Sequence, residues 1–478
     1  MDARRPFDEM PPHKRPRNEQ ETPAESEVDR ISDLPEGVLH HLLSLMPAHD
    51  AVRTCVFGQR WRHLWRSAPA ISFTTFDGFR SADRFNQFVD RLLLLRRHGA
   101  PLESCNFLLV ETEVYSDVFL AANERTVSGW ISRALRLQVR VLRFCIGFDD
   151  LFWLPDTPLF SQHLTVLELD GVTTNERVLD FSGCPLLVDL KMEGCFVNSD
   201  KMSSSSLKHL RMSSCMFYDN HRTRLSLPNL VSLELDYIPG RTPLLESMPS
   251  LVTAIVRLGC ESCDRCEEGE PGGCDDHLCE GCRYYYDSDD YRGHSVILQG
   301  LLQATSLELS SEPDVIVFKR DIKWCPTFSK LKTLVLDEWF ATDDLSALIW
   351  FLQHSPILEK LSLQLPVVVP KKSVRRYSPI EQSVASDYLE LVEIKCQEID
   401  EMVVAILEIL NVFGVPLERI QIHKSSCFGS SSYVWTCSRS HGDSPFSREE
   451  VWLFIDLTSA DHPRCTQHVP SRDVAVLH

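Results

Sequence analysis

Cysteine residues gather in one stretch of the sequence, residues 259–290. Two Cys-x-x-Cys pairs lie there with twelve residues between them, Cys263 with Cys266 and Cys279 with Cys282. One tight turn lets such a pair aim two sulfurs at the same ion, and four thiolates are a common ligand set for tetrahedral zinc. The spacing predicts a structural zinc site with these four cysteines as ligands. The sequence suggests no other cofactor.

The composition of the same stretch favours a different interpretation. It contains eleven Asp or Glu residues against two Arg, so it carries a net charge of −9 within a chain of −19, and it has almost no aliphatic residues. A segment with so much charge and so little apolar surface cannot bury a core of its own. An acidic insertion with incidental cysteines therefore explains the pattern at least as well as zinc does. A disulfide or redox role is a third interpretation.

The insertion interrupts a regular series of apolar segments. The structure that these segments form must therefore position the insertion. Segments of the form apolar-x-x-apolar-x-apolar recur at intervals of 20 to 31 residues on either side of it. Within a strand, positions two apart point to the same face, so each segment has an apolar side that only a neighbour can bury. This spacing is typical of a leucine-rich repeat solenoid with one strand per repeat. The segments begin at Val139, Leu164, Leu187, Leu207, Leu230 and Leu251 before the insertion, and at Ala304, Leu331, Leu358, Leu389 and Leu417 after it.

Three other stretches have helical periodicity. Residues 81–97 carry an apolar stripe that predicts one helix packed along that face. Residues 343–354 and 398–413 have the length and pattern of helices, which predicts that the C-terminal repeats place a helix on their convex side.

Residues 29–73 have the pattern of three short helices. Ser32 or Asp33 can cap the first helix, with Pro35 in its first turn, and Pro47 and Gly58 mark the two breaks. A unit of roughly 40 residues lies near the lower size limit for independent folding, so part of its apolar surface is expected to meet another surface.

This segment resembles the F-box of a large plant family of F-box proteins with leucine-rich repeats, many of which end in a region called FBD. The resemblance rests on LPEGVL at residues 34–39, LMPAHDAVRTC at 45–55 and RWRHLW at 60–65. It implies docking to a Skp-type adaptor and, through it, to a cullin-RING ubiquitin ligase, with the chain as a non-catalytic substrate receptor. The residues expected in the adaptor contact, or in the small core that shapes it, are Leu34, Pro35, Leu39, Leu42, Leu43, Val52, Val56, Trp61 and Trp65.

The chain departs from the family pattern at one place. The family usually has a serine and a basic residue where this chain has Gly58 and Gln59. A glycine at the start of a helix costs roughly 1 kcal/mol relative to alanine. An alternative function is therefore a leucine-rich repeat scaffold for protein interactions that works outside any ligase, with a weakened F-box.

The predicted fold class is α/β, with a three-helix F-box followed by an irregular repeat solenoid and a C-terminal FBD-like region. Because residues 389–422 resemble the FBD region, that part is expected to span 386–460. The complete organisation is a disordered tail at 1–27, the F-box at 28–73, a linker and helical cap at 74–138, repeats at 139–385 with the acidic insertion at 259–290, the FBD-like region at 386–460 and a tail at 461–478.

Charge and motif content narrow the function further. A net charge of −19 argues against direct nucleic-acid binding, which depends on Lys and Arg meeting phosphates. No apolar stretch has the length of a membrane span, and no known catalytic motif is present, so neither a membrane partner nor enzymatic activity is expected. The 17 cysteines suit a reducing compartment, and the expected location is the nucleus, the cytoplasm or both.

Elemental analysis of the purified protein tests the zinc prediction. If the four thiolates close a tetrahedral site, we expect about one equivalent of zinc per chain, and Cys263→Ser should remove most of it. A content below half an equivalent that the substitution leaves unchanged would exclude the site.

Overall fold

The computed structural model describes the greater part of the chain between residues 31 and 436. The described residues are 31–74, 79, 81–96, 100–110, 124–147, 152–154, 158–174, 179–218, 222–259, 261–262, 295–312, 315, 317–323, 325–341, 345–366, 388–425 and 432–436. The predicted tails at 1–27 and 461–478 lie outside these ranges, and so do Cys263, Cys266, Cys279 and Cys282. The zinc site therefore stays a prediction.

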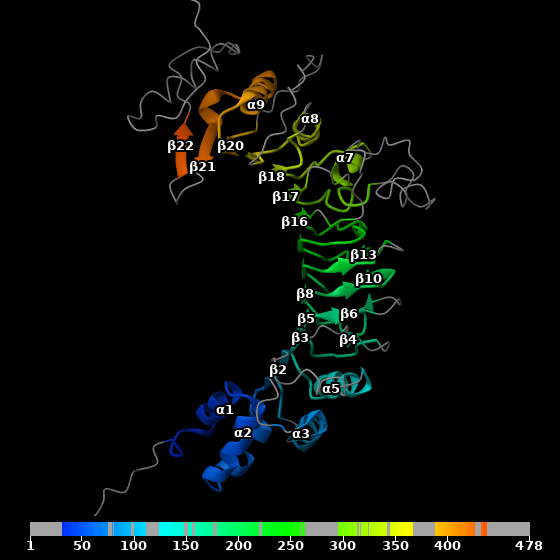
Figure 1. The fold of residues 1–478 in the computed structure, drawn as a ribbon, viewed down its shortest axis with the longest axis vertical. Helices are drawn as coiled ribbons and strands as arrows, with labels where there is room; N and C mark the ends of the chain where they lie inside the picture. Colours follow the sequence, from blue (N-terminus) through cyan, green and yellow to red (C-terminus); the bar gives the residue numbers. More distant parts are fainter. Residues whose placement is uncertain are drawn as a thin grey trace, which may run out of the picture.

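One sheet of fourteen strands runs the length of the molecule (Figure 1). Its strands follow one another in chain order and pair in parallel until the last pair, which is antiparallel. The strand predicted in each apolar segment is confirmed, and the sheet also extends beyond the first predicted repeat to β1 and β2. The strands are β1 Ala70–Thr74, β2 Ser104–Val110, β3 Val141–Gly147, β5 Val166–Asp170, β8 Asp189–Glu193, β11 His209–Ser213, β14 Ser232–Asp236, β16 Thr253–Leu258, β17 Ser306–Ser311, β18 Thr333–Glu338, β19 Lys360–Gln364, β20 Leu391–Cys396, β21 Ile420–Ser425 and β22 Ser432–Thr436.

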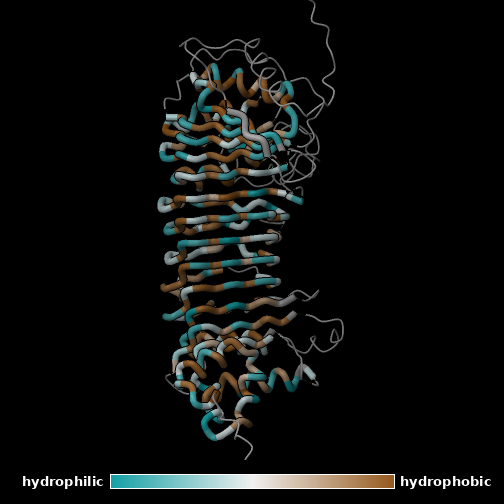
Figure 2. The backbone as a smooth tube through the Cα atoms, turned by 90° about the vertical axis from the view of Figure 1, so that its left-hand side faces the viewer, coloured by the Kyte–Doolittle hydropathy of each residue, from teal (hydrophilic) through white to brown (hydrophobic). Residues whose placement is uncertain are grey.

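The core of this sheet is a stack of apolar side chains, one layer per strand. Leu167, Leu190, Leu210 and Leu233 are register partners on successive strands, and each is at most 2% exposed. The intervening positions of the same strands are less buried, as the period of two residues requires. Figure 2 shows the strands as closely stacked rungs. Each rung therefore buries its apolar side chiefly against its two neighbours.

A left-handed residue follows several of the strands directly and turns the chain into the next layer. Gly171, Gly194, Ser214 and Tyr237 have φ angles of 68°, 56°, 52° and 49°. Each of these residues donates its backbone N–H to the carbonyl of the last or, for Tyr237, the second-last residue of the next strand, at 2.9 to 3.0 Å. A left-handed non-glycine residue costs roughly 1 kcal/mol or more, and this repeated hydrogen bond offsets that cost at Ser214 and Tyr237.

The elements that cover one side of the main sheet, the side of α5 and α7, differ between the earlier and the later repeats (Figure 1). In the earlier repeats it carries two small four-stranded sheets, of which one contains β4, β6, β9 and β12 and the other β7, β10, β13 and β15. Their bounds are β4 Phe152–Trp153, β6 Val172–Thr173, β7 Leu179–Asp180, β9 Phe196–Val197, β10 Lys201–Ser203, β12 Met216–Phe217, β13 Arg224–Ser226 and β15 Leu244–Leu245.

Helices replace these short strands in the later repeats. Beside α7 Val317–Asp321, the two helices predicted for this part of the chain are present as α8 Ser346–His354 and α9 Glu401–Val412. Asp400 caps α9, because its side chain accepts hydrogen bonds from the backbone N–H groups of Met402 and Val403. The helix predicted at residues 81–97 is α3 Ala82–Leu95, and a further helix, α5 Glu124–Arg136, packs against it.

The residues that flank the acidic insertion are fixed by the repeats. At its start, Ser262 forms a parallel bridge with Gly240. After it, Asp321, which is 0% exposed, accepts hydrogen bonds from the Ser295 hydroxyl at 2.8 Å and from the next three backbone N–H groups at 2.6 to 3.0 Å. The charge of this buried carboxylate is thus stabilised by four donors, and it fastens the start of one repeat to the helix of the next.

Asp321→Ala is expected to lower the free energy of unfolding by about 3 kcal/mol, because it leaves several buried N–H groups without an acceptor. Urea unfolding followed by circular dichroism measures the change. Asp33→Ala is the matched control, since Asp33 is exposed, and it should move the midpoint very little. Equal midpoints for the two variants would contradict this role of Asp321.

Candidate functional site

The N-terminal unit contains two α-helices, α1 Glu36–Ser44 and α2 Ala48–Arg53, followed by two 3₁₀ helices, η1 Thr54–Phe57 and η2 Trp61–Ser67. The third predicted helix is thus a 3₁₀ helix, and an additional turn precedes it. The predicted cap at Ser32 or Asp33 is wrong, because α1 begins after Pro35 and has no side-chain cap.

Ser32, one of the two predicted capping residues, makes a different interaction. The hydroxyl of Ser32 accepts a hydrogen bond from the indole N–H of Trp61 at 2.8 Å. The guanidinium group of Arg60 donates to the backbone carbonyls of Ser32 and Leu34. These contacts tie the residues before α1 to the start of η2, so the two ends of the unit close on each other.

The structure divides the nine predicted adaptor residues into a core and a surface. Leu39 and Leu43 on α1 are at most 1% exposed, and they belong to the same core as Trp61 and Trp65. Leu34 and Val52 are partly buried against that core. The remaining three, Pro35, Leu42 and Val56, are exposed.

Exposed apolar residues continue along α1 on the side away from this core. Val38, Leu42 and Leu45, at positions i, i+4 and i+7, are 44%, 39% and 70% exposed, and we call them the outer face of α1. Val56 and Phe57 on η1 are 79% and 69% exposed. A helix that is apolar on both sides is normally buried on both. The outer face is therefore a candidate site for a protein partner.

The N-terminal unit is packed against the first strand of the sheet. Both α1 and α2 contact β1, and Pro47 forms a parallel bridge with Ser72. At the end of α3, the guanidinium group of Arg96 donates to the carbonyl of Ala68 at 2.8 Å. Burial lowers the pKa of Arg96, whose side chain lies among the core residues of this junction. These contacts hold the outer face of α1 at a fixed place relative to the sheet.

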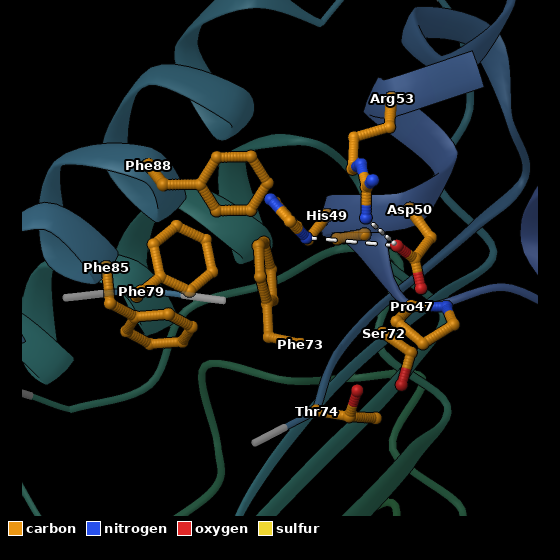
Figure 3. A pocket seen from close by; sticks show the side chains of 11 residues that line it. Pro47, His49, Asp50, Arg53, Ser72, Phe73, Thr74, Phe79, Phe85 and Phe88 are labelled. Atoms are coloured by element: carbon orange, nitrogen blue, oxygen red, sulfur yellow. Dashed lines mark hydrogen bonds and ion pairs between the residues drawn. The ribbon is translucent and has the colours of Figure 1, made fainter. Parts of the chain in front are cut away.

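A pocket of about 330 Å³ lies at this junction, between α2, β1 and α3 (Figure 3). Four phenylalanines form its apolar wall, namely Phe73, Phe79, Phe85 and Phe88. The ring of His49 lies 5.0 Å from that of Phe79, and Asp50 is 3.8 Å from His49 Nδ1 and 3.4 Å from Arg53 Nη1. The pocket can hold an apolar group, and three of its polar side chains, His49, Asp50 and Arg53, contact one another.

A second hollow, of about 510 Å³, lies beside Phe88, and we call it the α3 groove. It brings two predicted residues, Val52 and Trp65, next to the exposed side of α3. Sequence reasoning missed this side because it used the helix only as a source of core residues. The signal was present as polar and apolar residues at helical spacing. The groove is lined from α3 by Arg84, Gln87, Phe88, Arg91, Leu92 and Leu95.

The less buried face of the main sheet carries ion pairs between neighbouring strands. Arg143 contacts Glu168 at 2.9 Å, and Arg257 contacts Glu308 at 2.8 Å. Two of the other charged residues, Lys191 and Arg211, are register partners in the same row of side chains. Farther along, burial raises the pKa of Asp337, and a hydrogen bond from Ser310 opposes that effect. This face offers charged and hydroxyl groups in fixed register.

The described residues contain neither a cluster of metal ligands nor a helix that could span a membrane. No group of three or more His, Cys, Asp or Glu side chains there could hold a metal ion. In the same ranges, no helix combines the length and apolar character that crossing a membrane requires.

Comparison with known proteins finds that the chain is similar to F-box/LRR-repeat proteins of one plant. No family model matches the chain. It is 29% identical over 262 residues to an F-box/FBD/LRR-repeat protein of Arabidopsis thaliana, covering 48% of this chain and 60% of the relative. It is also 29% identical to an F-box/LRR-repeat protein of the same plant, in a match that covers 53% of this chain and 54% of the relative. A putative F-box/FBD/LRR-repeat protein of that plant is 30% identical, and the match covers 48% of this chain and 57% of the relative. The matches thus span a little over half the length of these relatives.

Two leucines on α1 test the division between core and surface. Leu39→Ala is expected to lower the free energy of unfolding by about 2–5 kcal/mol, because it opens a cavity in the core. Leu42→Ala, one turn away on the outer face, should cost less than about 1 kcal/mol. Thermal denaturation of the two purified variants makes the comparison. Similar losses of unfolding free energy for the two variants would show that Leu42 is part of the core and that the outer face is not available to a partner.

Proposed function

We propose that this chain, whose relatives are plant F-box/FBD/LRR-repeat proteins, is the substrate-recognition subunit of an SCF-type ubiquitin ligase. The N-terminal unit acts as the F-box and docks to a Skp-type adaptor. The parallel sheet acts as a leucine-rich repeat solenoid and binds a target protein.

The observation that carries the adaptor proposal is the outer face of α1. Folding buries Leu39 and Leu43 but leaves Val38, Leu42 and Leu45 partly or largely exposed. Each such side chain contributes at most roughly 1.5–3 kcal/mol when a partner buries it. A Skp-type adaptor is the partner that the F-box relatives suggest for this surface.

The target proposal is supported by the exposed face of the sheet. Its side chains come from many strands held in one parallel register, so a large surface stays rigid without a partner. Much of its charge is paired internally, as in the contact of Lys360 with Glu393 at 2.9 Å. A target must match this pattern closely, because an unmatched charge buried on binding costs several kcal/mol.

The mechanism that we propose needs no catalytic residue in this chain. The adaptor side places the chain in the ligase, and the repeat face holds the target beside the ubiquitin-carrying enzyme. Such tethering raises the effective concentration of a target lysine near the reactive thioester. The chain would therefore act as a receptor and not as an enzyme.

The FBD-like region ends the solenoid in this proposal. β20, α9 and β21 continue the repeat geometry, and β22 then pairs antiparallel with β21. The apolar side of α9 is buried, including Val403, Ile406 and Leu410 at 0% exposure. This region thus covers the core at the C-terminal end, as repeat proteins require of a terminal cap.

Titration of the full chain with a purified plant Skp-type adaptor tests the proposal. Leu42→Asp combined with Val56→Asp should weaken binding at least about 100-fold, because two apolar contacts of roughly 1.5–3 kcal/mol each are lost. The control is Leu186→Asp with Val252→Asp, two residues on the repeats that are 52% and 42% exposed. This control should bind like the unaltered protein.

Two outcomes would contradict the proposal. If the unaltered, folded chain does not bind the adaptor, the ligase function fails and the scaffold alternative with a weakened F-box takes its place. If the adaptor binds and the two double variants behave alike, binding occurs but not through the outer face of α1 or the neighbouring Val56.

A further inference from the structure

The floor of the α3 groove is apolar and adjoins the surface assigned to the adaptor. Val52 on α2 lines it, and Val56, one helical turn later, is 79% exposed. On the opposite side, Leu92 is buried, whereas Leu95 is 50% exposed and also lines the groove. Apolar surface thus extends from the N-terminal unit across the groove onto α3.

The border of the groove carries positive charge. Arg84, Gln87 and Arg91 are exposed and lie along one side of α3 at helical spacing. Within the described parts of the chain, no ion pair engages Arg84 or Arg91. Arg66 adds a third guanidinium, 5.3 Å from the ring centroid of Trp65 in the floor. This concentration of arginine stands out in a chain with a net charge of −19.

Of the two acidic residues on α3, Asp83 and Asp90, the second is paired with α5. Asp90 accepts a hydrogen bond from the indole N–H of Trp130 at 3.2 Å and forms an ion pair with Arg133, both on α5. Its carboxylate therefore does not neutralise the arginines of the groove. Those arginines remain available to acidic groups of a partner.

The shape and the chemistry together describe one kind of ligand. A hollow with an apolar floor beside a helix suits an amphipathic helix laid along it. Arg84 and Arg91 are seven residues apart, which is about 10 Å along the helix axis. A ligand helix with acidic residues two turns apart and an apolar stripe beside them would match both features.

We propose that the α3 groove is a second part of the adaptor interface and binds an acidic, amphipathic helix of the adaptor. The inference rests on the proposed function and extends the interface beyond the F-box sequence itself. Arg84 and Arg91 would then add electrostatic attraction to the apolar contact made by the outer face of α1.

Charge reversal tests this inference with the full chain and a purified plant Skp-type adaptor. Arg84→Glu with Arg91→Glu should weaken adaptor binding at least tenfold and should flatten its dependence on salt, because two charge contacts are lost. The matched control is Arg136→Glu with Arg140→Glu, which changes the net charge equally at two exposed residues outside the groove. We expect that control to stay within threefold of the unaltered protein.

A photo-crosslinking residue in place of Gln87 locates the ligand directly. Mass spectrometry should find a crosslink to an adaptor segment that contains several Asp or Glu residues. The same residue in place of Arg136 should give none. A crosslink to a second copy of this chain, or to an adaptor segment without acidic residues, would overturn the inference.

The outcomes separate this inference from the function on which it rests. If Leu42→Asp with Val56→Asp abolishes binding while the groove variant binds like its control, the receptor function stands and the groove proposal fails. If the unaltered chain does not bind the adaptor at all, the proposed function itself fails.

Discussion

Each strand of the main sheet can bury its apolar side only against the strands beside it, and the rest of the structure depends on this constraint. The aligned leucines of successive strands form a core that is open at the first and the last strand. The first and last strands would therefore expose both backbone groups and apolar side chains. At one end α1 and α2 pack on β1, and at the other β22 reverses direction against β21. The helical unit is thus a cap for the repeats as well as a candidate docking surface.

This dual role links the two proposed binding functions. A separate domain on a flexible linker would leave the distance between adaptor and target undetermined. Here the buried Arg96, the bridge between Pro47 and Ser72, and the pairing of β1 with β2 fix that distance through packed structure. The number of strands between the N-terminal unit and the strands that bind the target would then determine the distance from the adaptor to the target. Such rigid positioning suits a receptor that works by proximity.

Helix α3 connects these parts, and its two sides have different tasks. Phe85 and Val89 are at most 2% exposed, and Phe85 contacts the ring of Trp130 on α5. The other side lines the α3 groove with arginine and leucine, while Phe88 lines both the groove and the neighbouring pocket. The F-box sequence pattern ends before this helix begins. A docking surface that includes α3 would therefore be specific to F-box proteins with such a helix.

The sequence by itself determined the features that rest on local periodicity. The strand in each repeat, helices α3, α8 and α9, and the apolar residues of the F-box segment could all be predicted, because spacings of two and of about 3.6 residues are written in neighbouring positions. Tertiary structure alone decided which side of α1 is buried, since Leu39 and Leu42 are equally apolar and only the position of Trp61 and Trp65 distinguishes them. It also moved the Ser32 hydroxyl from a cap to the indole of Trp61, 29 positions away. The periodicity of α3 showed that the helix has a polar side, but only the tertiary structure placed that side next to Val52 and Trp65, which are distant from it in sequence.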